Sequence, residues 1–349
     1  MGDSIDAIFH KFIGKERWQA LRQRFGNGVT TIFSANESGV FVALTVFFFV
    51  MVAVSPAFRT PYNLTVILKQ ISVASILGMG QTLVIISGAF DLSQGAIAGL
   101  ASMVSAIAWQ RWGFSPILAI SLGLLIGISC GYFNGMLAAR LRLHPFVMTL
   151  ATSTIFLGLS FFASRGDPVT GLPETFLWLG KGNFFFIPAP VLIMLMVTFL
   201  MQILLTKTLF GRRVFMIGGN TDVANSLGLK IDQIRIYIYV ISGFLSALGG
   251  IVAVGRTGAS IPSIGSDLLF PVVTATIIGG TLLSGGVGSM LGTLIGASIM
   301  GIVRNSLAIL QVDLFLQDVV QGALVVVALI IDQFRRGQLT WKIIIGKDR

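Results

Sequence analysis

Long apolar runs without charged residues recur along almost the whole chain, and they limit its folding more than any other feature. The run at 40–54, for example, reads VFVALTVFFFVMVAV. A membrane-spanning helix needs roughly 20 apolar residues, whereas membrane β-barrel strands alternate polar and apolar positions. Only 11% of the 349 residues are charged, less than half of the roughly 25% typical of soluble domains. The sequence therefore predicts an all-α polytopic membrane protein and excludes a water-soluble globule or a disordered chain.

Glycine, proline and charged residues divide the apolar runs into about ten predicted membrane spans. The eighth span is short and begins with Phe270-Pro271, which predicts a broken or re-entrant segment. The transmembrane domain is predicted over 39–332, between a basic, amphipathic N-terminal segment at 1–38 and a basic tail at 333–349. The predicted spans cover residues 39–58, 64–86, 92–108, 116–139, 145–163, 188–205, 234–253, 268–283, 288–309 and 314–331.

Basic residues gather on the side of the predicted spans that would carry both termini. Seventeen of the 24 lysines and arginines fall there, so we expect both termini to be cytoplasmic. The net charge of +10 is then explained by span ends that meet anionic lipid, and nucleic acid is not an expected partner. The first 38 residues contain no long apolar run, which argues against a cleavable signal peptide; either an interfacial helix or a loosely ordered tail fits them.

Sequence patterns for catalysis and for metal or nucleotide binding are missing. His10 and His144 are far apart in the sequence, and Cys130 is the only cysteine, so no metal site is expected. The stretch Gly127-Ile-Ser-Cys-Gly131 fits GxSxG but lies inside an apolar span, where helix packing is the favoured interpretation. No GxxxxGK[ST] motif occurs, so ATP and Mg²⁺ would have to bind to another chain. We expect a non-enzymatic subunit without a cofactor.

Glycines recur at every fourth position in the fourth and ninth predicted spans. Small residues at this spacing let helices approach closely in lipid. Both spans contain G-x-L-I-G and an asparagine further along, which favours two pseudo-repeated halves, as in many transporters. The alternative is that glycine is simply common in membrane helices. The predicted packing positions are Gly123, Gly127, Gly131, Gly135, Gly288, Gly292 and Gly296.

Polar residues inside the predicted spans are candidates for a translocation path, because each is costly in lipid unless it faces a cavity or a partner. Asp91 is the most prominent. Capping the third span is the favoured interpretation of this residue, and lining the path is the second. Amides and hydroxyls also join helices by hydrogen bonds without any role in transport. The path candidates are Gln81, Asp91, Ser93, Asn134, Ser153 and Asn305.

A polar segment between the sixth and seventh spans predicts a short helix. Asn220 or Thr221 can cap it and Gly228 ends it. A helix of two turns is not stable alone in water, so its apolar stripe should pack on this protein or in a groove of a second protein. That stripe consists of Val223, Ala224 and Leu227.

Four segments in both halves of the chain carry a family resemblance: GAFDLSQGAIAG at 88–99, GYFNGMLAARLRLHPFVMTLAT at 131–152, GRRVFMIGGNTDVANSLGLK at 211–230, and IIGGTLLSGGVGSMLGTLIGASIMGIVRNSL at 277–307. Together they resemble the permease subunits of bacterial ATP-binding cassette (ABC) importers of the simple-sugar class, the ribose, xylose and autoinducer-2 type, which share a superfamily with branched-chain amino acid permeases. The resemblance covers about 40–332. It implies a type II importer fold in the inner membrane, a permease dimer, two cytoplasmic ATPases and a periplasmic sugar-binding protein.

The resemblance also implies a coupling helix at about 218–230. The family pattern E-A-A-x-x-x-G corresponds here to Asp222-Val-Ala-Asn-Ser-Leu-Gly228. One departure is that LFPVVTA at 269–275 stands where the family usually has acidic E-L-D-A-I-A-A, and Asp267 is the nearest acid. The residues expected to contact the ATPase are Gly219, Asn220, Asp222, Ala224, Leu227 and Gly228.

The expected function is import of a monosaccharide or similar small sugar, energised by the partner ATPases. Two alternatives stay open: an ion-coupled secondary transporter or channel, and an ABC permease for an amino acid or other small polar solute. Ion coupling usually needs carboxylates within the membrane, and Asp91 is the only strong candidate. The sequence does not distinguish a homodimer from a heterodimer.

Overall fold

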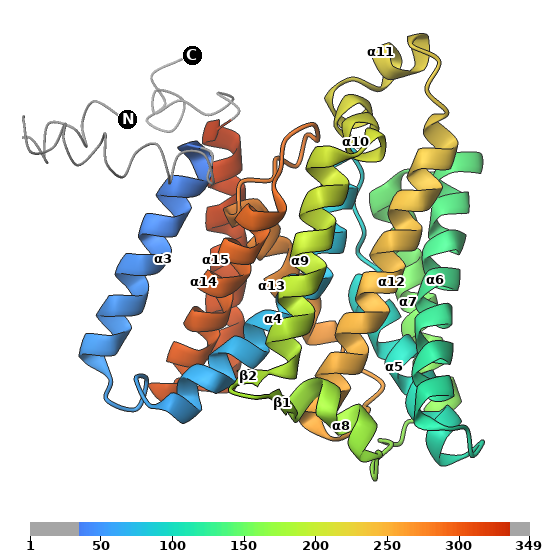
Figure 1. The fold of residues 1–349 in the computed structure, drawn as a ribbon. Coiled ribbons are helices and arrows are strands. Elements are labelled where there is room, and N and C mark those ends of the chain that lie inside the picture. Colours follow the sequence, from blue (N-terminus) through green and yellow to red (C-terminus); the bar gives the residue numbers. More distant parts are fainter. Residues whose placement is uncertain (1–34, 336–349) are drawn as a thin grey trace, which may run out of the picture.

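The computed structural model describes residues 35–335 and consists mainly of long helices that run roughly side by side (Figure 1). The predicted N-terminal segment and basic tail therefore lie almost wholly outside the described residues. The first half contains α3 (Ala35–Val54), α4 (Pro61–Ile86), α5 (Gln94–Gln110), α6 (Pro116–Arg140), α7 (Pro145–Ser164) and α8 (Glu174–Lys181). It is followed by β1 (Asn183–Phe184), β2 (Ile187–Pro188), α9 (Ala189–Lys207), α10 (Leu209–Gly219), α11 (Thr221–Ser226), α12 (Ile231–Thr257), η1 (Ser266–Leu268), α13 (Leu269–Ile278), α14 (Met290–Ile309) and α15 (Leu314–Arg335).

Proline and hydroxyl residues explain where several long helices begin. Helices α4, α6, α7 and α9 each have a proline in the first turn, where its missing N–H costs no hydrogen bond. The hydroxyls of Thr60 and Ser115 accept hydrogen bonds from Asn63 N at 3.3 Å and Leu118 N at 3.4 Å. These caps satisfy backbone groups that the helix itself leaves unpaired.

Each of the ten predicted ranges overlaps a helix. Among the described residues, six helices (α4, α6, α7, α9, α12 and α14) are long and apolar enough to cross a membrane. Helix α5 has 17 residues and α13 has ten, which agrees with the expectation that the eighth span is broken. The ninth span was predicted to begin at 288, but α14 begins at Met290 because Ser289 caps it and accepts a hydrogen bond from Gly292 N at 3.3 Å.

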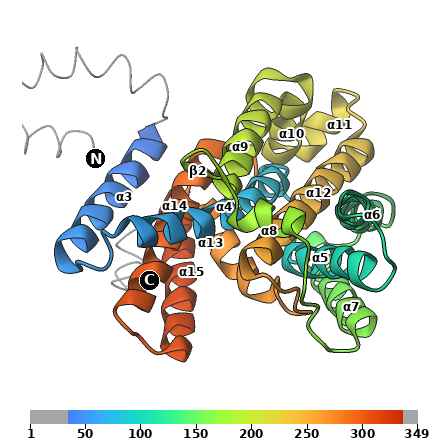
Figure 2. The same ribbon diagram turned by 60° about the horizontal axis from the view of Figure 1, so that its bottom comes forward.

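Helices α4 and α12 form the centre of the bundle, and α3, α6 and α7 lie at its periphery (Figure 2). The large, fully buried side chains of α4 and α12 include Leu77, Met79, Leu83 and Tyr239. On α6, by contrast, Leu125, Tyr132 and Phe133 are exposed, as expected for a helix face that meets lipid.

Non-helical backbone precedes the two short helices: residues 87–93 lead into α5, and residues 258–265, followed by the 3-10 turn η1, lead into α13. The second stretch touches the first turn of α5, since a Cβ on either Gly95 or Gly265 would overlap with the other's carbonyl. Irregular backbone is tolerated at membrane depth only where protein covers it. The outer part of 258–268 is held by paired hydrogen bonds between Val169 and Ser260, at 2.8 and 2.9 Å.

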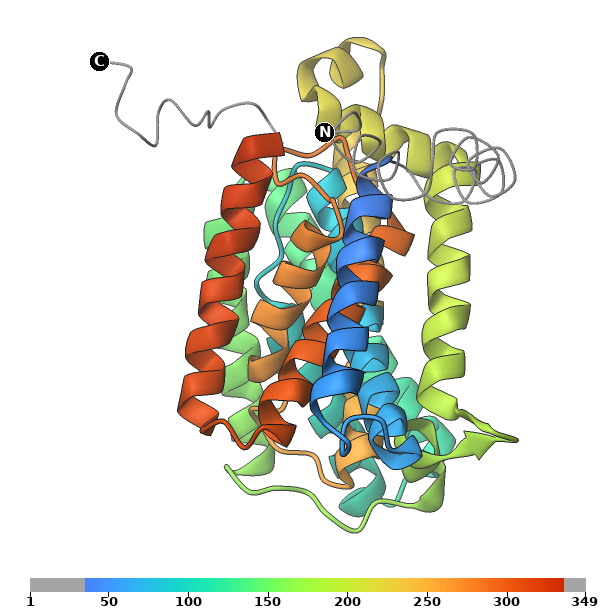
Figure 3. The ribbon, with the colours of Figure 1, turned by 90° about the vertical axis from the view of Figure 1, so that its left-hand side faces the viewer.

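The two ends of the bundle differ. Helix α3 begins and α15 ends at the end that carries α10 and α11, whereas α8 and the β1–β2 hairpin lie at the opposite end (Figures 1 and 3). The described part of the chain thus enters and leaves the bundle on the same side.

Six of the seven predicted glycine positions lie at close helix contacts. On α6, a Cβ on Gly127 would overlap with Gly243 and Ala247 of α12, and one on Gly131 would overlap with the Tyr239 carbonyl. Gly135 faces Ile236 of α12, whereas Gly123 lies closest to Ala101 and Ser105 of α5. On α14, Gly296 faces Ala275 and Gly292 faces Gly279. Gly288 lies in the preceding loop, against Ile86.

Candidate functional site

Asp91 is the centre of a buried polar cluster that joins three parts of the chain. Its Oδ1 accepts hydrogen bonds from Ser93 N at 2.9 Å and Ser93 Oγ at 2.6 Å, and its Oδ2 accepts one from Ser242 Oγ at 2.9 Å. Asn134 Nδ2 donates to Ser93 Oγ at 2.7 Å, and Gln94 Nε2 donates to Ser242 Oγ at 2.7 Å. The cluster links the 87–93 stretch to α6 and α12.

Side chains also hold the backbone of the 87–93 stretch. Tyr239 Oη donates to the Phe90 carbonyl at 3.1 Å, and Leu92 N donates to Thr149 Oγ1 at 3.0 Å. The N-cap residue of α5 is Ser93, not Asp91, so the predicted capping role is wrong in its detail. Asp91 instead fixes the non-helical turn before the helix, because its carboxylate bonds to Ser93 and reaches across to α12.

The other path candidates are also enclosed between helices or bonded to neighbours. Asn305 and Asn63 exchange two amide hydrogen bonds, at 2.8 and 3.0 Å, which join α14 to α4. Gln81 is fully buried, and neither polar atom of its side chain has a hydrogen-bond partner among residues 35–335. Ser153 is half-buried on α7. Three candidates, Asp91, Ser93 and Asn134, are thus brought together, while Gln81, Ser153 and Asn305 lie apart from them; a role for any of the six in the path stays a prediction.

A pocket lined by both charged and apolar side chains, which the sequence did not predict, lies between η1, α13, α14 and α15. Its volume is about 480 Å³. Asp267, Arg304, Asp318 and Gln321 line it together with the ring of Phe270. The signal was present in the sequence, because Asp318 and Gln321 lie three residues apart in an otherwise apolar predicted span and so share one helix face.

The charges of this pocket indicate what the α13–α15 face meets. Asp318 and Asp267 are exposed in the single chain, and Arg304 is half-buried. A charged side chain that faces lipid within a span costs several kcal/mol. Within a membrane, water or another protein against this face would cost less than hydrocarbon.

The segment predicted to meet an ATPase forms two short helices at one end of the bundle. The hydroxyl of Thr208 caps α10 and accepts from Gly211 N at 3.2 Å, and Asn220 Oδ1 caps α11 and accepts from Val223 N at 3.0 Å. Gly228 has a φ of +76°, a conformation that glycine adopts without strain. Within α11 only Ala224 is buried.

The apolar stripe of α11 is only partly covered by this chain. Val223 is 54% exposed and Leu227 is 62% exposed. Asp222 is exposed beside them. Exposed apolar side chains at the tip of a short helix are typical of a surface that a partner protein covers.

The end of α10 lies at a junction of three glycine-rich turns. Gly218 packs against the Ile86 carbonyl and Gly286, and its Cα lies close to Gly88. Gly286 N donates a hydrogen bond to the Ile86 carbonyl at 2.8 Å. The α10–α11 segment thus touches both the turn that leads to the Asp91 cluster and the turn that leads to α14.

Among the described residues, no group of three or more His, Cys, Asp or Glu side chains is placed to bind a metal ion. Long apolar helices packed around a buried polar cluster, with two non-helical stretches inside the bundle, define a multi-pass membrane protein. The chain belongs to the family described as branched-chain amino acid transport system / permease component, whose model matches residues 63–329.

Several curated relatives are sugar permeases. The ribose import permease protein of Bacillus subtilis (strain 168) is 38% identical over 84% of this chain and 92% of its own length. The fructose import permease protein of Rhizobium meliloti is 35% identical over 80% of each chain. The L-arabinose ABC transporter permease protein of Azospirillum brasilense is 32% identical over 87% of this chain and 89% of its own length.

Proposed function

We propose that this chain is the membrane-spanning subunit of an ABC importer for a monosaccharide or similar small sugar. The observation that carries the proposal is the 38% identity to a ribose import permease, over 92% of that relative's length. Relatives named for fructose, arabinose and allose support the same class of solute. The membrane-embedded part has no nucleotide-binding motif, so separate subunits would bind ATP and Mg²⁺ and supply the energy.

We infer ten crossings arranged as two inverted halves. The ten would comprise the six long helices, the helices α3 and α15, and two composite crossings. The composite crossings are 87–93 with α5 and 258–268 with α13. Equivalent contacts support the repeat: α12 packs on α6 as α4 packs on α14, and α5 packs on α6 and α7 as α13 packs on α14 and α15. Helices α4 and α12 run in opposite directions (Figure 1), as inverted repeats require.

The sugar path is proposed to run along the α13–α15 face rather than through the Asp91 cluster. Sugars need hydrogen-bonding partners but no counter-charge, and the pocket offers carboxylates, a guanidinium, an amide and the Phe270 ring. The Asp91 side chain, in contrast, is fully buried and hydrogen-bonded to Ser93 and Ser242. Water or a second permease subunit against the α13–α15 face would also remove the cost of its charges.

Coupling to the ATPase is proposed to act through α11 and the glycine junction. Val223 and Leu227 offer apolar side chains to a partner groove, and Gly218 touches turns of both halves. A movement of α10–α11 driven by ATP would then bias the bundle between inward-open and outward-open states. In this proposal α10–α11 and both termini would be cytoplasmic, and the α8 end would face a periplasmic sugar-binding protein.

The test is uptake by reconstituted vesicles that contain this chain, its ATPase and its binding protein. We expect uptake of a labelled monosaccharide, among ribose, fructose, arabinose and allose, that requires both ATP and the binding protein. Vesicles with this chain alone are the control and should take up none. Uptake by this chain alone, driven by a proton or sodium gradient, would overturn the proposal in favour of an ion-coupled transporter.

A further inference from the structure

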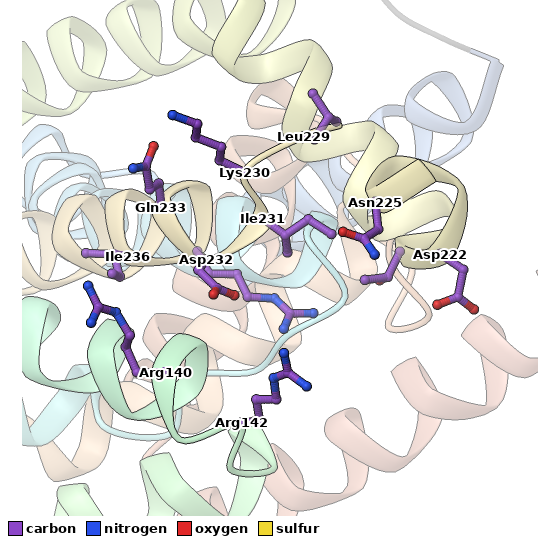
Figure 4. Close-up of a pocket in the computed structure, with 12 residues that line it drawn as sticks. Arg140, Arg142, Asp222, Asn225, Leu229, Lys230, Ile231, Asp232, Gln233 and Ile236 are labelled. Carbon is purple, nitrogen blue, oxygen red and sulfur yellow. The ribbon is translucent and has the colours of Figure 1, made fainter. Parts of the chain in front are cut away.

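A polar pocket of about 570 Å³ lies where the end of α6 meets the α11–α12 junction (Figure 4). Arg140 from the last turn of α6 and Arg142 from the following turn reach across the pocket toward the first turn of α12 (Figure 4). Cations outnumber anions in its lining. The charged lining residues are Arg140, Arg142, Lys230, Arg235, Asp222 and Asp232.

The protein offsets only part of the positive charge of this pocket, since its lining has more basic side chains than carboxylates. Within residues 35–335, none of its arginines or its lysine forms an ion pair with a carboxylate, and their side chains donate no hydrogen bond. Arg142 is held close to Arg140 by a backbone turn with φ of +51°. An excess of positive charge that a fold keeps in one place attracts an anion from outside the chain.

An apolar groove continues from the pocket along the outer face of α6. Its volume is about 530 Å³, and Arg140 borders both cavities. The groove residues recur every three or four positions and so form one helix face about 18 Å long, slightly more than half of a hydrocarbon core about 30 Å thick. They are Ser129, Tyr132, Phe133, Met136, Leu137 and Leu141.

We propose that this composite site binds one anionic phospholipid. Its phosphate lies between Arg140 and Arg142, and one acyl chain lies along the α6 groove. Charge complementarity favours an anionic headgroup, and the adjoining apolar groove distinguishes a lipid from a free anion. Because Asp222 and Asn225 of α11 line the same pocket, a bound lipid would hold the α11 segment against the end of α6. The proposal depends only on the membrane location of the chain and not on the solute it carries.

Lipid occupancy of the purified, delipidated full-length chain tests this, measured by native mass spectrometry during titration with phosphatidylglycerol or phosphatidylcholine. We expect one phosphatidylglycerol to bind at least tenfold more tightly than phosphatidylcholine. The double substitution R140Q/R142Q should weaken phosphatidylglycerol binding roughly 10- to 30-fold. The charge-conserving R140K/R142K should keep most of the affinity, which separates loss of charge from loss of folding.

R59Q/R165Q is the matched control, because it removes the same charge at the α8 end of the bundle and also includes one residue with positive φ. It should bind phosphatidylglycerol as the unmodified chain does. Equal binding of both lipids, displacement of phosphatidylglycerol by inorganic phosphate at the same concentration, or full affinity in R140Q/R142Q would each overturn the lipid site. If R140Q/R142Q loses ATPase association in lipid-free detergent while its lipid binding is unchanged, the pocket belongs to the ATPase contact instead.

Discussion

The Ser242 hydroxyl donates a hydrogen bond to Asp91 Oδ2 at 2.9 Å and thereby ties a non-helical turn of the first half to the middle of α12. The same hydroxyl accepts from Gln94 Nε2 at 2.7 Å. Ser242 therefore completes the hydrogen bonding of a buried carboxylate, for which an unpaired charge would be costly. The Asp91 cluster therefore holds the 87–93 stretch against α6 and α12.

Ser242→Ala should destabilise the protein more than the same substitution one turn later. It removes a hydrogen bond to a charged group, typically about 1.5–3 kcal/mol, and also leaves Gln94 without that partner. Ser246→Ala is the matched control, since the fully buried Ser246 hydroxyl donates only to the Ser242 carbonyl, at 2.8 Å, and should cost about 1 kcal/mol or less. Thermal unfolding in detergent measures both; equal losses would contradict the proposed role of the cluster.

Gly131→Ala should loosen the contact between α6 and α12. A Cβ at this position would overlap with the Tyr239 backbone, which cannot move aside as a side chain can, and such overpacking costs about 1–3 kcal/mol. Gly158→Ala on α7 meets nothing within 4 Å and should stabilise the helix by up to about 1 kcal/mol. The two melting temperatures should shift in opposite directions, and a shift of the same sign and size would refute the packing argument.

Leu227→Asp should uncouple transport from ATP hydrolysis without unfolding the bundle. Leu227 is 62% exposed, so the substitution costs little in the isolated chain but places a charge in the proposed ATPase contact. We expect at least tenfold lower uptake in reconstituted complexes and weaker retention of the ATPase on the immobilised permease. Leu310→Asp is the control, because Leu310 follows the last turn of α14 just as Leu227 follows that of α11, and it is 52% exposed. Unchanged uptake and ATPase retention in Leu227→Asp would rule out this surface.

Cysteine labelling can test whether the α13–α15 face meets water. Cys130 is the only cysteine, so Cys130→Ser provides a thiol-free background. In that background Gln321→Cys should react with a charged methanethiosulfonate reagent, and the transported sugar should slow the reaction. Leu125→Cys on the exposed, lipid-facing side of α6 should react at least tenfold more slowly, because thiolate formation is disfavoured in hydrocarbon. Similar rates at the two positions would refute a water-filled path at α15.

Asp318→Asn should lower sugar uptake while leaving ATPase binding intact. The carboxylate lines the proposed path and would accept hydrogen bonds from a sugar through both oxygens, whereas its amide analogue offers only one acceptor oxygen. We expect a loss of about tenfold in uptake at low sugar concentration. Asp167→Asn is the control, since Asp167 is exposed in the loop after α7 at the other side of the bundle. An equal loss of uptake in both variants would mean that the change in net charge, and not the position of Asp318, lowers uptake.

Helix positions were accessible to sequence analysis because they depend on local properties. Apolar runs predict spans, the start predicted at 116 coincides with Pro116 of α6, and Asn220 with Gly228 delimits α11 within about two residues. The glycine spacing on α6 likewise predicted a close contact, but not its partner. Basic residues are less decisive for orientation in the described part, since they occur at both ends of the bundle: Arg140 and Arg212 lie at the α11 end, and Arg165 and Lys181 at the other.

The sequence by itself determined the solvent of this protein, because so few charges cannot surround so much apolar surface with water. Tertiary structure decided which polar residues are enclosed and which are open. Asn305 meets Asn63 across 242 positions, and Asp91 is enclosed by α6 and α12, whereas Asp318 and Gln321 line an open pocket. Hydropathy is a property of each residue and its neighbours in the chain. Burial of a polar side chain between helices depends on how each helix is rotated against partners that are distant in sequence.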